Sequence, residues 1–221
     1  MRKITVVSIL TLTAFLFAGC AGVMTFRNPN KSKEAKIAGG AKAVQPVKFE
    51  DFENGTLVGS YGYANTAGGA NVKYAIGDPS ADKAHGGQYC AVASYNTGTN
   101  SDWGCGFGSA SSYASGGYFD AGGRDHITFW ANVPENVTFY VFINEASANG
   151  ADGEFWNGPS ITGSGKWVEY SVPFDELFKN IYSGSQMGNN AFDPQGIGVV
   201  GFQIGGNQGK DKFMVDDIWF K

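Results

Sequence analysis

Residues 137–144 read Val-Thr-Phe-Tyr-Val-Phe-Ile-Asn, and this stretch decides the fold class. Its odd-numbered positions are all apolar, whereas Thr138, Tyr140, Phe142 and Asn144 occupy the even ones. A period of two is typical of a β-strand, because successive side chains point to opposite faces of a sheet. Tyr140 and Phe142 make the second face bulky as well. The stretch therefore predicts a strand with one face in a core and the other on a partly exposed, aromatic surface.

Similar runs recur along the chain, each bounded by Gly, Pro, Asn or Asp, which favour turns. The further predicted strands are residues 47–53, 72–76, 88–95, 103–107, 126–133, 166–172, 198–204 and 212–220. Only residues 174–182 show helical spacing, and they predict one short helix. Many short strands without interleaved helices are typical of an all-β protein. The sequence therefore predicts an antiparallel β-sandwich of the jelly-roll type.

The composition agrees with this prediction. The 221 residues include 33 glycines, 14% aromatic residues and only 16% charged residues. A disordered chain is poor in aromatics and rich in charge, and a helical bundle is rich in Ala, Glu, Lys and Leu. Both classes are excluded, and the length suits one domain behind a leader.

The first 46 residues have the features of an export signal and a tether. Arg2 and Lys3 precede an apolar run at 4–17 that is short for a membrane span. The run ends in Leu-Phe-Ala-Gly-Cys, which resembles the lipobox of bacterial lipoproteins and implies lipidation of Cys20. The alternative is an ordinary signal peptide with an unrelated cysteine.

These features divide the chain into a lipoprotein signal peptide (1–19), a flexible basic tether (20–46) and a β-sandwich domain (47–221). We expect an exported protein of the bacterial cell envelope, at the outer membrane or cell surface. A lipid anchor would be its only contact with the membrane.

Charge separates the tether from the domain. Residues 21–46 carry five basic residues and one acidic residue, whereas residues 47–221 carry nine basic and nineteen acidic residues. An acidic domain without a basic stripe does not suit a polyanion. Nucleic acid is therefore not an expected partner.

The two remaining cysteines lie in neighbouring predicted strands. If residues 88–95 and 103–107 form a hairpin, Cys90 lies opposite Cys105, and export permits a disulfide between them. Two buried free thiols are the alternative.

Five segments resemble, in order, the family 11 carbohydrate-binding modules and their relatives among the galactose-binding-like jelly rolls. They are residues 49–55 (Phe-Glu-Asp-Phe-Glu-Asn-Gly), 86–92 (Gly-Gly-Gln-Tyr-Cys-Ala-Val), 127–131 (Ile-Thr-Phe-Trp-Ala), 167–174 (Trp-Val-Glu-Tyr-Ser-Val-Pro-Phe) and 213–220 (Phe-Met-Val-Asp-Asp-Ile-Trp-Phe). The resemblance covers nearly the whole domain. It implies a non-catalytic module that binds a β-glucan-like polysaccharide or oligosaccharide on the concave face of the sandwich.

Sugar recognition needs flat aromatic surfaces for pyranose rings, and amides or carboxylates for hydroxyl groups. Several aromatic residues lie in polar, Gly-rich settings, and the long loop at 145–165 offers a rim for a cleft. For any single aromatic residue, packing against the sandwich is the competing interpretation. The predicted carbohydrate-binding residues are Tyr61, Tyr63, Trp103, Tyr113, Tyr140, Asp152, Trp156 and Gln203.

The resemblance also implies a structural Ca²⁺ between the first and last strands. The predicted ligands are Glu50, Asp51, Glu53 and Asp217, with Asp216 beside them. Carboxylate oxygens suit this hard cation. The alternative is that these acids are ordinary residues at strand edges.

Catalytic signatures are weak. His85 and His126 are the only histidines and have no second ligand at metal spacing. The Gly-x-Gly-x-x-Gly match at 196–201 leads into a predicted strand and opens no βαβ unit, so it is rejected as a nucleotide site. The prediction is therefore a binding protein, with an envelope protein or a glycoside hydrolase as a further partner. A structural or assembly protein using the same face is the alternative, and a small glycoside hydrolase or lyase ranks third.

Overall fold

Antiparallel strands make up nearly all the regular structure of the chain in the computed structural model, which describes residues 44–145, 153–184, 186 and 188–221. Cys20, the signal peptide and Asp152 lie outside the described residues, so the predictions for them are unaffected by the structure. The described residues belong to one compact unit that spans residues 42–221. No helix among them is long and apolar enough to cross a membrane.

The first sheet has six strands in the order β10-β6-β13-β4-β3, with β1 paired to the far end of β13. Its strands are β1 (Val47–Glu50), β3 (Asn71–Ile76), β4 (Ala91–Asn96), β6 (His126–Asn132), β10 (Trp167–Pro173) and β13 (Lys210–Phe220). The long strand β13 therefore pairs with β4 along its first half and with β1 along its second half.

The second sheet has seven strands in the order β11-β8-β7-β12-β5-β2, and β9 pairs with β7. Its strands are β2 (Val58–Ala64), β5 (Cys105–Ala110), β7 (Thr138–Glu145), β8 (Glu154–Asn157), β9 (Ile161–Thr162), β11 (Phe178–Gly184) and β12 (Ile197–Ile204). The 3-10 helices η1 (Thr66–Gly68), η2 (Phe174–Glu176) and η3 (Pro194–Gly196) are the helical elements of the described residues.

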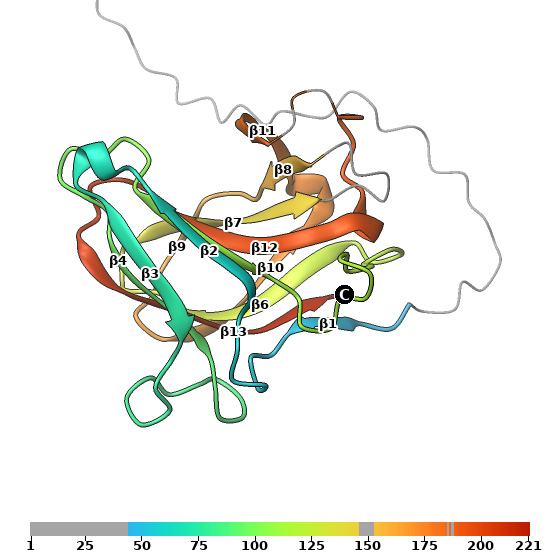
Figure 1. Cartoon of the computed structure of the whole chain (residues 1–221), viewed down its shortest axis with the longest axis horizontal. Coiled ribbons are helices and arrows are strands. Elements are labelled where there is room, and N and C mark those ends of the chain that lie inside the picture. Colours follow the sequence, from blue (N-terminus) through green and yellow to red (C-terminus); the bar gives the residue numbers. More distant parts are fainter. Residues whose placement is uncertain (1–43, 146–152, 185, 187) are drawn as a thin grey trace, which may run out of the picture. The chain divides into compact units, whose positions relative to one another are not determined.

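The two sheets pack face to face, with β7 and β12 in one layer and β6 and β13 in the other (Figure 1). Phenylalanine side chains fill the space between them. Phe107 and Phe202 of the second sheet both contact Phe213 of the first, at centroid distances of 5.2 Å. Phe139 meets Phe213 edge to face at 5.0 Å. This geometry is the one that aromatic pairs prefer, so the core is tightly interlocked.

The β-sandwich and all nine predicted strands are confirmed, as is the alternation in β7. Phe139, Val141 and Ile143 belong to the core cluster, whereas Tyr140 and Phe142 do not. Strands β2, β8, β9 and β11 were not predicted. The short helix predicted at 174–182 is wrong: only η2 is helical, and β11 follows it directly. The helical spacing came from Phe174, Leu177, Phe178 and Ile181, but Phe178 and Ile181 lie on an edge strand with exposed side chains and form no apolar helix face.

The predicted Cys90–Cys105 disulfide is also wrong. Strand β4, which follows Cys90, belongs to the first sheet, and β5, which begins at Cys105, belongs to the second. The two runs therefore form no hairpin, and both residues are buried free thiols. Burial raises the pKa of Cys90 to about 12 and that of Cys105 to about 11.

Candidate functional site

The outer face of the second sheet carries a row of paired residues that runs across four strands. Tyr63 on β2 pairs with Gly106 on β5, Gly106 pairs with Gln203 on β12, and Gln203 pairs with Tyr140 on β7. Directly opposed residues of an antiparallel sheet project to the same face. The strand register thus brings two tyrosines and a glutamine from distant parts of the sequence onto one surface.

Gly106 is the position that shapes this row. A Cβ there would lie 2.4 Å from the Tyr63 hydroxyl and 2.8 Å from the Gln203 Oε1. The absent side chain lets the Tyr63 ring lie across β5, where its hydroxyl donates a hydrogen bond to Gln203 Oε1 at 2.6 Å. The aromatic ring is therefore held flat against the sheet.

A second row of paired residues lies beside the first, and on each shared strand its member is two residues away from the member of the first row. It runs from Tyr61 through Gly108, Gly201, Phe142 and Asn157 to Phe178. The Phe142 ring covers Gly201, since a Cβ at that glycine would lie 2.2 Å from Phe142 Cζ. Aromatic rings therefore lie over two glycines inside the sheet, Tyr63 over Gly106 and Phe142 over Gly201.

The result is a cleft of about 900 Å³. It is lined by Tyr63, Asp102, Trp103, Tyr140, Asn157, Phe178, Asn180, Tyr182, Ser183 and Gln203. Its floor comes from the sheet, one wall from the loop before β5, and the other wall from β11.

The aromatic rings form a continuous platform on one side of the cleft. Tyr61 and Tyr63 are stacked with centroids 6.1 Å apart and planes at 22°. Trp103 follows at 6.0 Å from Tyr63, and its side chain is 45% exposed. Such a surface can receive a flat ligand with an apolar face.

Burial raises the pKa of the tyrosines on this face. It raises the pKa of Tyr61 to about 12, and it raises the pKa of Tyr63 further, with contributions from Tyr140 and Tyr61. It also raises the pKa of Tyr140. The three phenols, which are neutral at physiological pH even with an ordinary pKa near 10, therefore stay uncharged to still higher pH.

Gln203 has a different role from the predicted one. It is buried, and its Nε2 donates to the carbonyl oxygens of Trp103 and Ile204 while its Oε1 accepts from Tyr63. Both the oxygen and the nitrogen of the side-chain amide are thus used within the protein. Gln203 supports Tyr63 and the Trp103 loop from below instead of offering its amide to a ligand.

The structure places Tyr63, Trp103, Tyr140 and Gln203 at the cleft and stacks Tyr61 on Tyr63, but two other predicted residues lie elsewhere. Trp156 is buried, and its Nε1 donates to Glu145 Oε1 at 2.6 Å. It pairs with Lys179 and points away from the face of its neighbour Asn157. Tyr113 donates through its hydroxyl to Asp51 at 3.0 Å and lines a separate hollow beside Lys48. The prediction that Trp156 and Tyr113 line the cleft is therefore wrong.

The cleft also contains residues that the sequence analysis did not select as ligands: Asp102, Asn157, Phe178, Asn180, Tyr182 and Ser183. Most of them lie on β8 and β11. The signal that would have found them is the alternation of Phe178, Asn180 and Tyr182, which is a strand pattern.

The four predicted calcium ligands do not converge. Glu50 accepts hydrogen bonds from the Phe52 and Ser112 amides, and Glu53 accepts from the Gln88 and Tyr89 amides. Asp51 pairs with Lys48 at 2.7 Å. The carboxylates are thus engaged with separate protein donors.

Asp217, one of the predicted ligands, lies instead beside Asp216 and a histidine. Among the described residues, His85, Asp216 and Asp217 form the one group of three whose ligand atoms lie within 4.8 Å of one another. Asp216 already accepts from the His85, Gly86 and Asp217 amides. An imidazole and a largely satisfied carboxylate do not match the oxygen-rich set that Ca²⁺ prefers. Calcium stays a prediction of the resemblance, without support from these donors.

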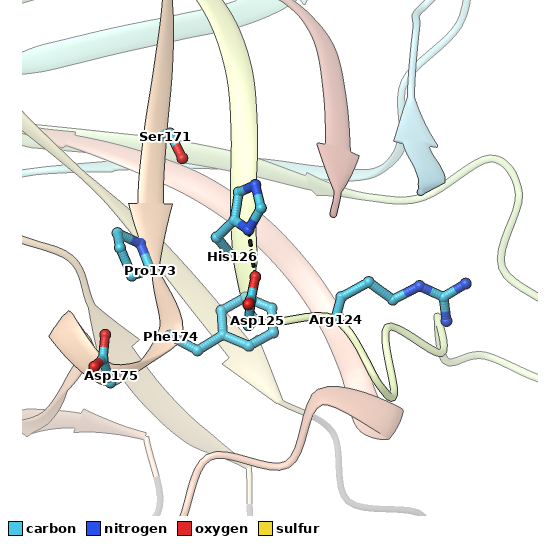
Figure 2. A pocket seen from close by; sticks show the side chains of 7 residues that line it. All are labelled: Arg124, Asp125, His126, Ser171, Pro173, Phe174 and Asp175. Carbon is cyan, nitrogen blue, oxygen red and sulfur yellow. Dashed lines mark hydrogen bonds and ion pairs between the residues drawn. The ribbon is translucent and has the colours of Figure 1, made fainter. Parts of the chain in front are cut away.

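A second hollow, of about 620 Å³, lies beside His126. Three of its polar side chains are paired: His126 Nδ1 contacts Asp125 at 2.5 Å, and Arg124 donates to the carbonyl oxygens of Gln45 and Gly122. Figure 2 shows the Arg124 side chain pointing away from His126. Among the residues that the structure describes, the lining of this hollow contains no tyrosine or tryptophan, so it lacks the aromatic platform of the cleft.

The fold is a β-sandwich similar to that of solved carbohydrate-binding modules. The chain is similar to a family 11 carbohydrate-binding module of a cellulosomal cellulase of Clostridium thermocellum, with a TM-score of 0.59 and 24% identity, over 81% of this chain and 95% of that one. A family 11 module from Clostridium thermocellum, solved in complex with a β-1,3-1,4-mixed-linked tetrasaccharide, gives a TM-score of 0.59 and 23% identity, over 81% and 96% of the two chains.

A carbohydrate-binding module of the β-sandwich superfamily matches with a TM-score of 0.50 and 14% identity, over 79% of this chain and 62% of that one. No protein-family model matches the sequence. No curated protein matches it either. The structural likeness confirms the predicted fold, that of the family 11 modules.

Proposed function

We propose that this protein is a non-catalytic polysaccharide-binding protein whose ligand lies in the cleft of the second sheet. The observation that carries the proposal is the aromatic platform of Tyr61, Tyr63 and Trp103, which faces an opposite wall with amide and hydroxyl groups. Pyranose rings stack their CH faces on such rings, while polar side chains bond their hydroxyl groups.

A β-glucan is the ligand class that fits the likeness best. One of the similar modules was solved with a β-1,3-1,4-mixed-linked tetrasaccharide. The cleft of this chain also has the size range of a small-molecule site and combines apolar rings with a few polar groups.

The composition of the cleft favours binding over hydrolysis. Glycoside hydrolases of the common types use two carboxyl groups on either side of the scissile bond. Asp102 is the single carboxylate that lines the cleft among the described residues.

The sequence adds a location to this proposal. Lipidation at Cys20 would attach the domain to the bacterial envelope through the basic tether. A tethered module raises the local concentration of glucan near the membrane or near a glycoside hydrolase bound to the same polymer.

Isothermal titration of residues 42–221 with the mixed-linked tetrasaccharide tests the proposal, with xylotetraose as the comparison ligand. We expect saturable binding of the mixed-linked sugar and a loss of roughly tenfold or more in Trp103→Ala. Absence of binding to both sugars and to a glycan array would contradict a carbohydrate ligand. Release of reducing sugar would contradict the non-catalytic role.

A second candidate is a structural or assembly protein that uses the same face for protein contact. The exposed side chains of Trp103, Phe178 and Tyr182 on this face are the observation that favours it, because aromatic residues are also enriched at protein interfaces. Cross-linking in the envelope would distinguish the two: cross-links from this face to a single protein partner support this candidate.

A further inference from the structure

Strand β11 forms one wall of the cleft, yet its pairing with the sheet is incomplete. It is an edge strand, and it pairs with β8 at Phe178–Asn157, Lys179–Trp156 and Gly184–Glu154, with an irregularity between Lys179 and Gly184. Asn180 and Tyr182, which line the cleft, lie within that irregularity. Backbone pairing alone therefore does not fix the wall.

Glu154 lies behind this wall and is completely buried. Its Oε1 accepts a hydrogen bond from Lys179 Nζ and another from the Asn190 amide at 3.2 Å. Lys179 Nζ also donates to Asn190 Oδ1 at 2.7 Å. A single carboxylate thus joins β8, β11 and the segment that follows β11.

The carboxylate fits closely into its surroundings. A Cβ at Gly188 would lie 2.4 Å from Glu154 Cδ, so the chain after β11 passes directly over the carboxylate. The Lys179 side chain is only 14% exposed. The ion pair is therefore shielded from water and is held in one geometry.

Such a pair contributes little net stability, because the cost of desolvating two charges offsets much of their attraction. The ion pair does fix the position of the Lys179 side chain. Lys179 points to the opposite face from Phe178 and Asn180, since neighbouring side chains of a strand alternate. Anchoring Lys179 behind the sheet therefore sets how Phe178 and Asn180 stand in the cleft.

We propose that Glu154 is a positioning residue for ligand binding, and that it holds β11 through Lys179 so that Phe178, Asn180 and Tyr182 form the second wall of the cleft. This inference rests on the proposed function for its ligand. Its structural part, the anchoring of β11, is independent of any ligand.

The first test measures the anchoring directly by hydrogen exchange with mass spectrometry. We expect amide exchange within residues 178–184 to be at least about tenfold faster in Glu154→Gln, with unchanged exchange in β6 and β13. The matched control is Glu169→Gln, which removes an exposed pair with Lys221 at 2.7 Å on the first sheet. Unchanged exchange in 178–184 would overturn the proposal.

The second test is a double-mutant cycle for binding of the mixed-linked tetrasaccharide, with Glu154→Gln and Tyr182→Ala. If Glu154 acts through the wall, the double variant should bind the sugar as strongly as the single variant that has the lower affinity. A loss of affinity in the double variant equal to the product of the two single losses would show that the residues act separately, and it would overturn the proposal.

If Glu154→Gln does not fold, Lys179→Gln serves as the second variant. It removes the ammonium group that joins β11 to Glu154 and keeps a polar side chain at that position. It should also raise exchange in 178–184, and unchanged exchange would overturn the proposal. If the original chain binds no glucan, the proposed function fails, whereas the exchange result still decides whether Glu154 anchors β11.

Discussion

The Tyr63 hydroxyl donates to Gln203 Oε1 at 2.6 Å, although the two residues are 140 positions apart in the sequence. The bond passes over Gly106, whose strand lies between theirs. It joins an aromatic ring of the platform to a buried amide that also holds the backbone of Trp103. One glutamine thus holds the Tyr63 ring and the backbone of Trp103, and such pre-organisation reduces the entropy lost on binding.

The first prediction concerns Gly106→Ala. The new methyl group would lie 2.4 Å from the Tyr63 hydroxyl, so the ring must leave its position over the strand. We expect the affinity for the mixed-linked tetrasaccharide to fall by roughly tenfold or more, measured by titration calorimetry. Tyr63→Phe is the control: it keeps the ring, loses one hydrogen bond of about 1 kcal/mol, and should bind within a few fold. Unaltered binding by Gly106→Ala would show that the ring position is not needed.

The second prediction compares Trp103 and Trp156, both of which were predicted from the sequence to bind carbohydrate. Trp103→Ala should weaken binding and leave the melting temperature nearly unchanged, because the side chain is exposed in the cleft. Trp156→Ala should lower the free energy of unfolding by about 3–5 kcal/mol, because it removes a buried ring and the indole N–H that donates to Glu145 Oε1. Urea denaturation and titration calorimetry on both variants check this, and the reverse pattern would contradict the assignment of Trp103 to the cleft.

The third prediction concerns the thiols of residues 42–221. Alkylation in denaturant without a reductant should modify both Cys90 and Cys105, as measured by intact mass, because both are free. In the folded protein neither should react near neutral pH, since burial raises the pKa of Cys90 to about 12 and that of Cys105 to about 11. Alkylation that requires prior reduction would show a disulfide instead.

The fourth prediction concerns pH. Burial is the main cause that raises the pKa of Glu145, and the neighbouring Glu154 contributes. A carboxyl group with a raised pKa in the folded state holds its proton while the unfolded chain loses it, so stability falls as pH rises. The loss begins near the unfolded pKa of about 4.3 and ends above the raised folded value.

Urea denaturation across pH 4.5 to 8 measures this effect. In Glu145→Gln the fall in the free energy of unfolding with rising pH should be smaller than in the original chain, because the amide does not ionise. An identical pH profile in both chains would contradict the raised pKa of Glu145.

The alternation in residues 137–144 and the runs like it were enough to predict nine strands and the sandwich. That information is local, because each strand must present one apolar face to the core. The prediction failed at β11, where Phe178 and Tyr182 do not face the core. The need to bury one face of the strand therefore did not constrain the sequence of β11, and its residues fitted helical spacing equally well.

The binding face was predictable only in part. Tyr140 was placed correctly because its neighbours Phe139 and Val141 are core residues, so alternation sends Tyr140 outward. Trp156 was misplaced because its short strand has no such pattern, and a tryptophan in a Gly-rich segment has the same composition whether it is exposed or buried.

By itself, the sequence determined the fold class, the acidic character of the domain and the aromatic supply for a binding face, because composition and period are local properties. Only the tertiary structure decided which residues meet. The disulfide disappeared because β4 and β5 entered different sheets, and the cleft appeared because the register of β2, β5, β12 and β7 aligns Tyr63, Gly106, Gln203 and Tyr140. Strand order and register are set by the packing of the whole sandwich, and no single segment encodes them.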